Sequence, residues 1–421
     1  MALSILFVTD VYPPMIGGVE LHTQMLSRCL VERGQRAAVA TPWQVGLHEQ
    51  EDDCGVTVWR LKGLAARVPW FSVNPNRRHH PPFPDPGMVW GLRRVIERFE
   101  PEVIHAYGWI TYSCIVALLG KKIPLVLSVQ EYAYTCALRT MMRYGKEPCS
   151  GPALAKCLDC AVSFYGPLKG VAAAAGVLSG RGLLRRKTSG VHSVSRYMQQ
   201  IIRRDLYGAL GEVHRRDGCV LHEAVIPNFR VEKPSVPVDI SAYLEKLPDR
   251  PYILFVGALR AVKGVQVLLE AYSLLPEPPP LVLIGVPAPD TPSTFPANVT
   301  VILNAPQAAV MEAWKYSLFG VAPSTWPEPF GSVIHEAMSQ GKAVISTGSG
   351  GQTDMIEDGT TGLLVPPNDK LALAATMQRL IEDHELREQL GRAARERAQR
   401  FTAEVVVPEV ERFYQAILEV H

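Results

Sequence analysis

The segment best equipped for chemistry runs from residue 323 to residue 338, with the sequence PSTWPEPFGSVIHEAM. Pro327 and Pro329 hold Glu328 in an extended loop, because a residue before proline avoids the helical region. Gly331 lets the backbone approach a ligand closely, and a helix is predicted to begin at Ser332. The free N–H groups of that first turn, together with the helix dipole, predict a site for a phosphate anion.

Two carboxylates, Glu328 and Glu336, flank this predicted anion site with seven residues between them. Carboxylates beside a phosphate would repel it unless they bind neutral hydroxyl groups instead. This charge argument favours a ligand that carries both hydroxyls and phosphate, a nucleotide-sugar, over a bare phosphate ester. The helix tip and its two acids are expected to face a crevice shared by two domains.

Short apolar runs alternate with amphipathic stretches, in two series, and predict parallel sheets covered by helices on both faces. The expected fold class is α/β, with two Rossmann-like doubly wound domains facing a cleft. The runs of the two series occupy residues 5–8, 37–40, 103–104, 125–127 and 190–194, and then 252–256, 281–284, 299–302, 318–321, 343–346 and 362–365.

The two series are separated by a stretch rich in proline and aspartate, Val231 to Asp249. We therefore expect an amino-terminal domain over residues 1–229 and a carboxy-terminal domain over 230–402. An amphipathic helix over 403–421 is predicted to pack back on the first domain. Five prolines between Val73 and Gly87 predict a loop there.

The composition excludes several classes of protein. Of 421 residues, 47% are apolar and 20% charged, which is typical of a folded globular chain. The net charge of +2 does not indicate a nucleic-acid binder. The start of the chain lacks the pattern of a signal peptide, and no apolar run is long enough to span a bilayer, so a cytoplasmic protein is expected.

One segment leaves a second location open, at the inner face of the membrane. Basic residues flank the apolar stretch Val171 to Leu184, and together they would form a cationic amphipathic surface suited to peripheral membrane contact. The alternative is an ordinary solvated helix face. The basic residues are Arg181, Arg185, Arg186 and Lys187.

The acid-containing segment, with other motifs in the same order, resembles the family-4 glycosyltransferases, which are retaining enzymes of the GT-B fold. The supporting motifs are a glycine-rich first loop (residues 10–20, DVYPPMIGGVE), Ile226-Pro227-Asn228, a basic loop (residues 256–264, VGALRAVKG), Gly350-Gly351 and residues 359–366, GTTGLLVP. The resemblance spans nearly the whole chain.

This resemblance implies a role for each matching residue. Glu328 would contact the transferred sugar, Glu336 the nucleotide ribose, and Lys263 the diphosphate, while His105 would be a catalytic residue of the first domain. The full set implied for donor binding is Gly17, Gly18, Arg260, Lys263, Phe330, Gly331, Ser332, Val333 and Glu336.

The chain departs from the family pattern at three places. Ala258 stands where an arginine is usual, and Arg260 would take its place. His105 is followed by Tyr107 where the family often has a second histidine, and Gln130-Glu131 replaces a His-Asp pair. These changes indicate a specialised acceptor side.

The chain also lacks an Asp-x-Asp triplet, so no cofactor or metal is expected for catalysis. A separate cluster has zinc-ligand character, because Cys157 and Cys160 have Cys-x-x-Cys spacing and two further cysteines lie nearby. A structural zinc ion, an iron-sulfur cluster, four reduced thiols and a redox role remain alternatives there. The four residues are Cys136, Cys149, Cys157 and Cys160.

The sequence thus predicts a retaining, metal-independent hexosyltransferase that uses a UDP-, GDP- or ADP-sugar and a glycan or lipid-linked acceptor. No nucleic-acid partner is expected. Two alternatives stay open: an epimerase or hydrolase of the same fold, and a non-catalytic nucleotide-sugar-binding protein.

Overall fold

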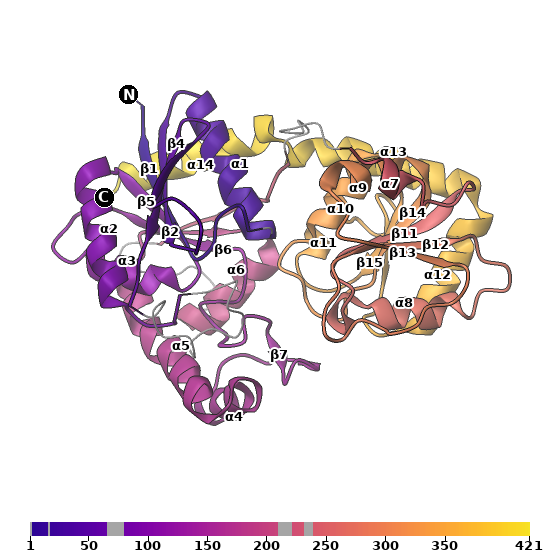
Figure 1. Ribbon diagram of the computed structural model, residues 1–421, viewed down its shortest axis with the longest axis horizontal. Coiled ribbons are helices and arrows are strands. Elements are labelled where there is room, and N and C mark those ends of the chain that lie inside the picture. The colour runs from indigo at the N-terminus through magenta and orange to yellow at the C-terminus, as the bar shows by residue number, and fades with distance from the viewer. Residues whose placement is uncertain (1, 16, 65–79, 209–220, 231–238) are drawn as a thin grey trace. The chain divides into compact units, whose positions relative to one another are not determined.

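The computed structural model describes residues 2–15, 17–64, 80–208, 221–230 and 239–421, and it divides into two α/β units (Figure 1). Unit 1 comprises Met1–Arg230 and Ala403–His421, and unit 2 comprises Val231–Thr402. Among the described helices, none combines the length and the apolar character needed to cross a membrane.

Unit 1 is built on an eight-stranded sheet in which only β3 runs antiparallel to its neighbour. The strand order places β1 between β2 and β5. The sheet therefore extends from β1 in both directions, through β2 and β4 on one side and through β5 and β6 on the other. In sheet order the strands are β10 (His222–Val225), β9 (Gly190–Ser193), β6 (Leu125–Val129), β5 (Val103–Tyr107), β1 (Ser4–Thr9), β2 (Arg36–Pro42), β4 (Val56–Leu61) and β3 (Gln50–Asp53).

Two helices of unit 1, α4 and α5, form a long hairpin. A small two-stranded sheet of β7 and β8 precedes this hairpin in the chain. The loop predicted from Val73 to Gly87 falls partly outside the described residues, and its end is helical, because α2 begins at Pro86. The elements are α1 (Gly18–Glu32), α2 (Pro86–Phe99), α3 (Ile110–Ala117), β7 (Met142–Arg143), β8 (Glu147–Pro148), α4 (Leu154–Tyr165), α5 (Pro167–Lys187), α6 (Arg196–Ile202) with the π-turn Arg203–Tyr207, and α14 (Ala403–Leu418).

Unit 2 has a six-stranded, wholly parallel sheet with helices packed against it. β11 lies at the centre, between β12 and β14. In sheet order the strands are β13 (Val299–Leu303), β12 (Leu281–Gly285), β11 (Tyr252–Val256), β14 (Ser317–Ala322), β15 (Val344–Thr347) and β16 (Leu363–Val365).

Helices follow most strands of unit 2, as the apolar runs predict, but β12 leads to β13 without a helix between them. The helices are α7 (Ser241–Leu244), the 3₁₀ turn Ala261–Lys263, α8 (Val265–Tyr272), α9 (Gln307–Tyr316), α10 (Ser332–Ser339), α11 (Gln352–Met355), α12 (Lys370–Glu382), α13 (His384–Ala398) and the 3₁₀ turn Gln399–Phe401.

Each of the eleven predicted apolar runs coincides with a strand to within one residue, and the sequence missed β3, β4, β10 and the two short strands β7 and β8. The missed strands lie at or near a sheet edge and are not buried throughout. Burial alternates along Val56–Leu61, and His222–Val225 is only half-buried at every position. Such strands carry polar residues on their solvent side, so they contain no continuous apolar run.

The last helix, α14, packs into the core of unit 1. Val406, Val410 and Ile417 are buried in the same cluster as Ile5 and Phe7 of the first strand. At the helix margin, Arg33 Nη2 donates to the Glu411 carboxylate over 2.7 Å.

Beneath α14 lies a group of fully buried histidines. His105 Nδ1 lies 2.7 Å from the Tyr414 hydroxyl, and His105 Nε2 lies 3.4 Å from His192 Nδ1. Burial lowers the pKa of His22 to about 3 and that of His192 to about 4, and it holds the pKa of His105 well below its usual value. His80, buried against Ser113, also has its pKa lowered by burial to about 4.

These four histidines predict that unit 1 loses stability in acid. Each binds a proton in the unfolded chain below about pH 6.5 but stays neutral in the folded unit, so the free energy of unfolding falls as the pH drops from about 6.5 towards 4. Burial raises the pKa of Asp10 to about 6, so the folded unit binds a proton there more readily than the unfolded chain does. This single carboxyl group opposes the trend that the four histidines set.

Calorimetric melting between pH 7.5 and 4.5 checks this prediction. His192→Gln should flatten the pH dependence, whereas His384→Gln on the exposed start of α13 should leave it unchanged. A transition temperature in the wild-type chain that does not fall with pH would contradict the interpretation.

Candidate functional site

The predicted donor residues meet at one point of the unit 2 sheet. Lys263 ends the loop that follows β11, and Glu328 lies in the loop that follows β14. β11 and β14 are neighbours, and β11 also pairs with β12 on its other side. This is the topological switch point of the sheet, where the loops at the carboxyl ends of parallel strands part and leave room for a ligand.

An ion pair joins the two loops. Lys263 Nζ lies 2.9 Å from Glu328 Oε1, and the Ser324 hydroxyl donates to the same carboxylate oxygen. The Lys263 ammonium also lies 5.5 Å from the centre of the Trp326 ring. Side-chain exposures of 28% for Lys263 and 12% for Glu328 leave both groups within reach of a ligand from solvent.

Two glycines allow these loops to come so close. Gly264 has φ +77°, and a Cβ there would lie 1.9 Å from the Pro323 carbonyl oxygen. Gly350 has φ +71°, and a Cβ there would lie 2.4 Å from the Glu328 carbonyl oxygen. Gly351 N donates to that same carbonyl over 2.6 Å, so the loop after β15 fixes the backbone of Glu328.

The helix predicted to begin at Ser332 is confirmed as α10. It starts directly after Gly331, which has φ +105° and provides no side-chain cap. Ile334 and Ala337 are buried, while Val333 is only half-buried. The first turn of α10, with its free N–H groups, therefore begins four residues after Glu328 in the sequence.

Other predicted residues are directed elsewhere. Arg260 Nε lies 3.2 Å from Asp290 Oδ1, so its charge is matched within unit 2. Glu336 is buried, with Trp314 Nε1 3.4 Å from its Oε2. Phe330 packs edge-on against Phe401, with ring centres 6.0 Å apart, so its backbone rather than its ring adjoins the start of α10.

In unit 1 the predicted residues are spread out. Gly17 adopts an extended conformation before α1, and a Cβ there would lie 2.2 Å from Glu20 Oε2, so a carboxylate of the chain itself adjoins this helix start. Gly18 has open space around it. His105 is fully buried, and both of its ring nitrogens face other side chains, which places it to support the core under α14.

The sequence missed a polar cluster at the switch point of unit 1, between β1 and β5. The Asp10 carboxylate, just after β1, accepts from Trp109 N (3.0 Å) and Ile110 N (2.7 Å) at the start of α3. Arg139 joins Asp10 over 3.2 Å and pairs with Glu131 as well. The position of Asp10 directly after the first strand could have indicated this cluster. Arg139 could not be predicted in the same way, because it comes from a loop far away in the sequence.

The four cysteines of the predicted zinc site are not assembled as ligands. Within the described ranges, which include all four, no group of three or more His, Cys, Asp or Glu side chains is arranged to hold a metal ion. The Cys160 sulfur accepts from Tyr144 N at 3.2 Å, and the Cys149 thiol lies 3.6 Å from the Gly151 carbonyl. The zinc interpretation stays a prediction that this geometry does not support.

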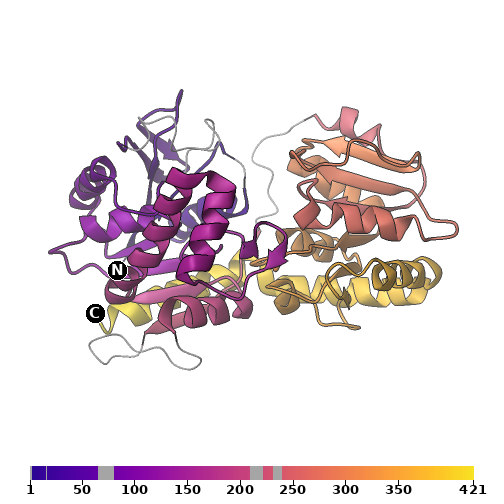
Figure 2. The same ribbon diagram turned by 90° about the horizontal axis from the view of Figure 1, so that it is seen from below.

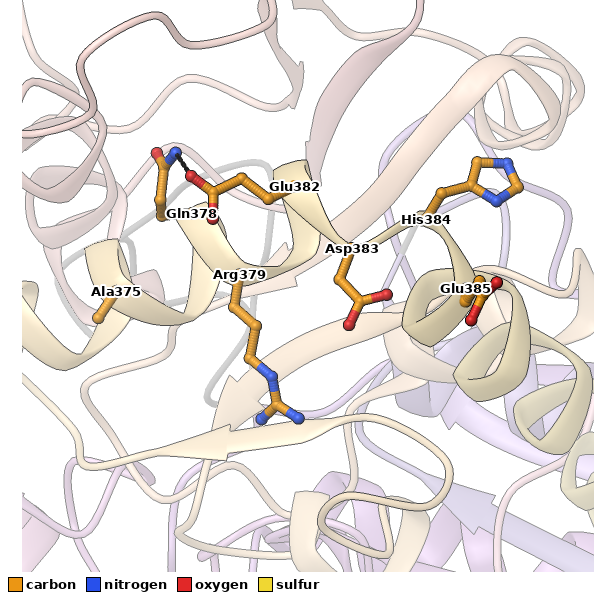
Figure 3. A pocket seen from close by; sticks show the side chains of 7 residues that line it. All are labelled: Ala375, Gln378, Arg379, Glu382, Asp383, His384 and Glu385. Atoms are coloured by element: carbon orange, nitrogen blue, oxygen red, sulfur yellow. Dashed lines mark hydrogen bonds between the residues drawn. The ribbon is translucent and has the colours of Figure 1, made fainter.

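A surface pocket in unit 2 lies away from these residues. Figure 3 shows it at the junction of α12 and α13, where Arg379, Asp383 and Glu385 contribute to its lining and Gln378 Nε2 donates to the Glu382 carboxylate. Asp383 caps α13 by accepting from Leu386 N over 2.8 Å. None of the predicted site residues lines it.

Comparison with known proteins decides the family. A model described as "Glycosyl transferase 4-like domain" matches residues 17–215, and one described as "Glycosyl transferases group 1" matches residues 239–397. The chain belongs to this glycosyltransferase family. The resemblance predicted from the motifs is confirmed, and the glycosyltransferase fold class of two Rossmann-like units with it.

Among curated relatives, this chain is 33% identical over 158 residues to alpha-D-kanosaminyltransferase from Streptomyces kanamyceticus. That match covers 35% of this chain and 41% of the relative, so the chain is matched over about two fifths of the relative's length. Among solved structures, sucrose-phosphate synthase from Thermosynechococcus elongatus has a TM-score of 0.72 at 19% identity and covers all of both chains.

A second solved structure, HepE from Anabaena in complex with UDP-glucose, has a TM-score of 0.64 at 19% identity, covering 98% of this chain and 100% of that chain. At such identities these two likenesses show the fold. They do not assign roles to individual side chains.

The packing of Gly350 on Glu328 gives a prediction with a matched control. Gly350 and Gly359 have nearly equal φ values, +71° and +74°, but a Cβ at Gly359 would meet nothing within 4 Å. Gly359→Ala should cost about 1 kcal/mol of stability from backbone strain alone. Gly350→Ala should cost clearly more, because it must also displace the Glu328 backbone.

Thermal or urea unfolding of the two variants measures this difference. Equal destabilisation by both substitutions would show that the Glu328 loop is not held by Gly350.

Proposed function

We propose that the protein transfers a hexose from a nucleotide-sugar to a glycan or lipid-linked acceptor, with retention of the anomeric configuration. The observation that carries the proposal is the Lys263–Glu328 ion pair at the switch point of unit 2, beside the start of α10. The family match and the UDP-glucose complex of HepE support a nucleotide-sugar donor. Retention rests on the resemblance to family-4 enzymes.

The proposed chemistry breaks the bond between the anomeric carbon and the diphosphate, and the acceptor hydroxyl forms the new glycosidic bond and releases its proton. Negative charge grows on the leaving diphosphate. Lys263 and the first-turn N–H groups of α10 would stabilise it, because they are fixed before the reaction begins. Glu328, held by Ser324, would lie beside the sugar, where positive charge develops.

A cation and a helix terminus can neutralise the diphosphate without a metal bridge, so we propose metal-independent catalysis. The structural zinc suggested by the cysteine spacing has no part in this step. The base and sugar of the donor would be selected by unit 2, and the acceptor by unit 1.

Removing the Glu328 charge should abolish most of the activity. With a panel of UDP-, GDP- and ADP-hexoses and a mixed-glycan acceptor screen, Glu328→Gln should lower kcat by about 100-fold or more, the effect of losing one preorganised electrostatic group. Glu277→Gln, on an exposed loop of the same unit, should leave the rate unchanged. Undiminished transfer by the Glu328 variant would refute the assignment.

Chelation offers an independent test. After treatment with EDTA and desalting, the transfer rate should stay within about twofold of its initial value, because Lys263 and α10 supply the stabilisation that a metal would otherwise give. A loss of activity that Mg²⁺ or Mn²⁺ restores would contradict metal independence.

A further inference from the structure

The α4–α5 hairpin of unit 1 is strongly asymmetric in charge. α5 contains no acidic residue over its 21 positions, and five of them are basic: Lys169, Arg181, Arg185, Arg186 and Lys187. α4 adds Lys156 and a single acid, Asp159, which accepts a hydrogen bond from the Tyr144 hydroxyl. The chain as a whole is nearly neutral, so this excess of positive charge is local.

One face of α5 is exposed and apolar. Leu168 is 77% exposed and Val171 49% exposed, and Phe164 at the end of α4 is 58% exposed. The exposed positions continue at Ala175, Ser179 and Gly182, the spacing of one helical face, so four turns carry no charge on this side. Leaving large apolar side chains in water is unfavourable, so such a contiguous stripe indicates a contact surface.

The opposite face of α5 is fixed to unit 1 by close packing. Cβ atoms placed on three of its glycines would lie 2.5 Å or less from neighbouring atoms: at Gly170 from Val162, at Gly176 from the Pro82 carbonyl, and at Gly180 from the Tyr112 ring. Figures 1 and 2 show α4 and α5 side by side in both views. The exposed stripe is therefore presented by a fixed element.

We propose that this face, defined by Phe164, Leu168 and Val171 with the basic end at Arg186 and Lys187, docks on an anionic lipid bilayer. An apolar stripe with basic residues and no acids is the pattern of a helix that lies in the interface plane of a membrane. The apolar side chains would enter the headgroup layer, and the cations would attract anionic headgroups. The docking is independent of the donor site, which lies in unit 2.

Vesicle co-sedimentation of the full-length chain tests this proposal. Binding is expected to vesicles of equal parts phosphatidylglycerol and phosphatidylcholine, and not to phosphatidylcholine alone. Arg186→Gln/Lys187→Gln should weaken binding by about tenfold or more, because each cation near an anionic surface contributes to the attraction, and added salt should have a similar effect.

The apolar contribution has a matched control. Leu168→Asp/Val171→Asp should reduce vesicle binding by about tenfold or more, whereas Leu371→Asp, at a 67% exposed position of α12 in unit 2, should not change it. Circular dichroism melting shows whether each variant remains folded. If Leu168→Asp/Val171→Asp unfolds, the Arg186→Gln/Lys187→Gln variant still tests the proposal.

Three results would overturn the proposal. They are no binding to the anionic vesicles, equal binding by wild type and both double variants, or self-association of the chain through this face without vesicle binding. In the last case, sedimentation velocity would show a dimer that Leu168→Asp/Val171→Asp dissociates, and the occupant of this face would be a second copy of the chain.

Discussion

The candidate site depends on one constraint: in a parallel sheet, loops that leave neighbouring strands in opposite directions open a space at the carboxyl ends of those strands. β11 and β14 create that space in unit 2, and the ion pair between Lys263 and Glu328 spans it. A cation and an anion from loops 65 residues apart in sequence thus meet at a place that the strand order alone selects. The same rule places Asp10 and the start of α3 at the switch point of unit 1.

Charge and backbone geometry act together at the unit 2 site. An ion pair that solvent can still reach adds little stability, so we do not expect the Lys263–Glu328 pair alone to hold the two loops in place. The loops are positioned instead by main-chain contacts, with Gly264 against Pro323 and Gly350 against Glu328. In the proposed function, Lys263 would exchange its carboxylate partner for a phosphate while the loops stay where they are. Such fixed charges are what leaving-group stabilisation requires.

Much of this could be predicted from sequence, for identifiable reasons. Buried parallel strands give continuous apolar runs, and Pro327, Pro329 and Gly331 signal a loop before a helix, so the core strands and α10 were found. Burial of His105 was not foreseen, because it depends on α14, whose Tyr414 lies 309 positions away. The Asp10–Arg139 contact and the pairing of Arg260 with Asp290 likewise join residues that no local pattern connects.

Calorimetric titration of UDP, GDP and ADP into the wild-type chain and the Lys263→Met variant tests the central claim most directly. The account predicts that at least one nucleoside diphosphate binds the wild type, and that the variant binds it about tenfold more weakly or worse, because the loop cation faces the diphosphate. Equal affinity in both proteins, or no binding of any of the three to the wild type, would contradict it.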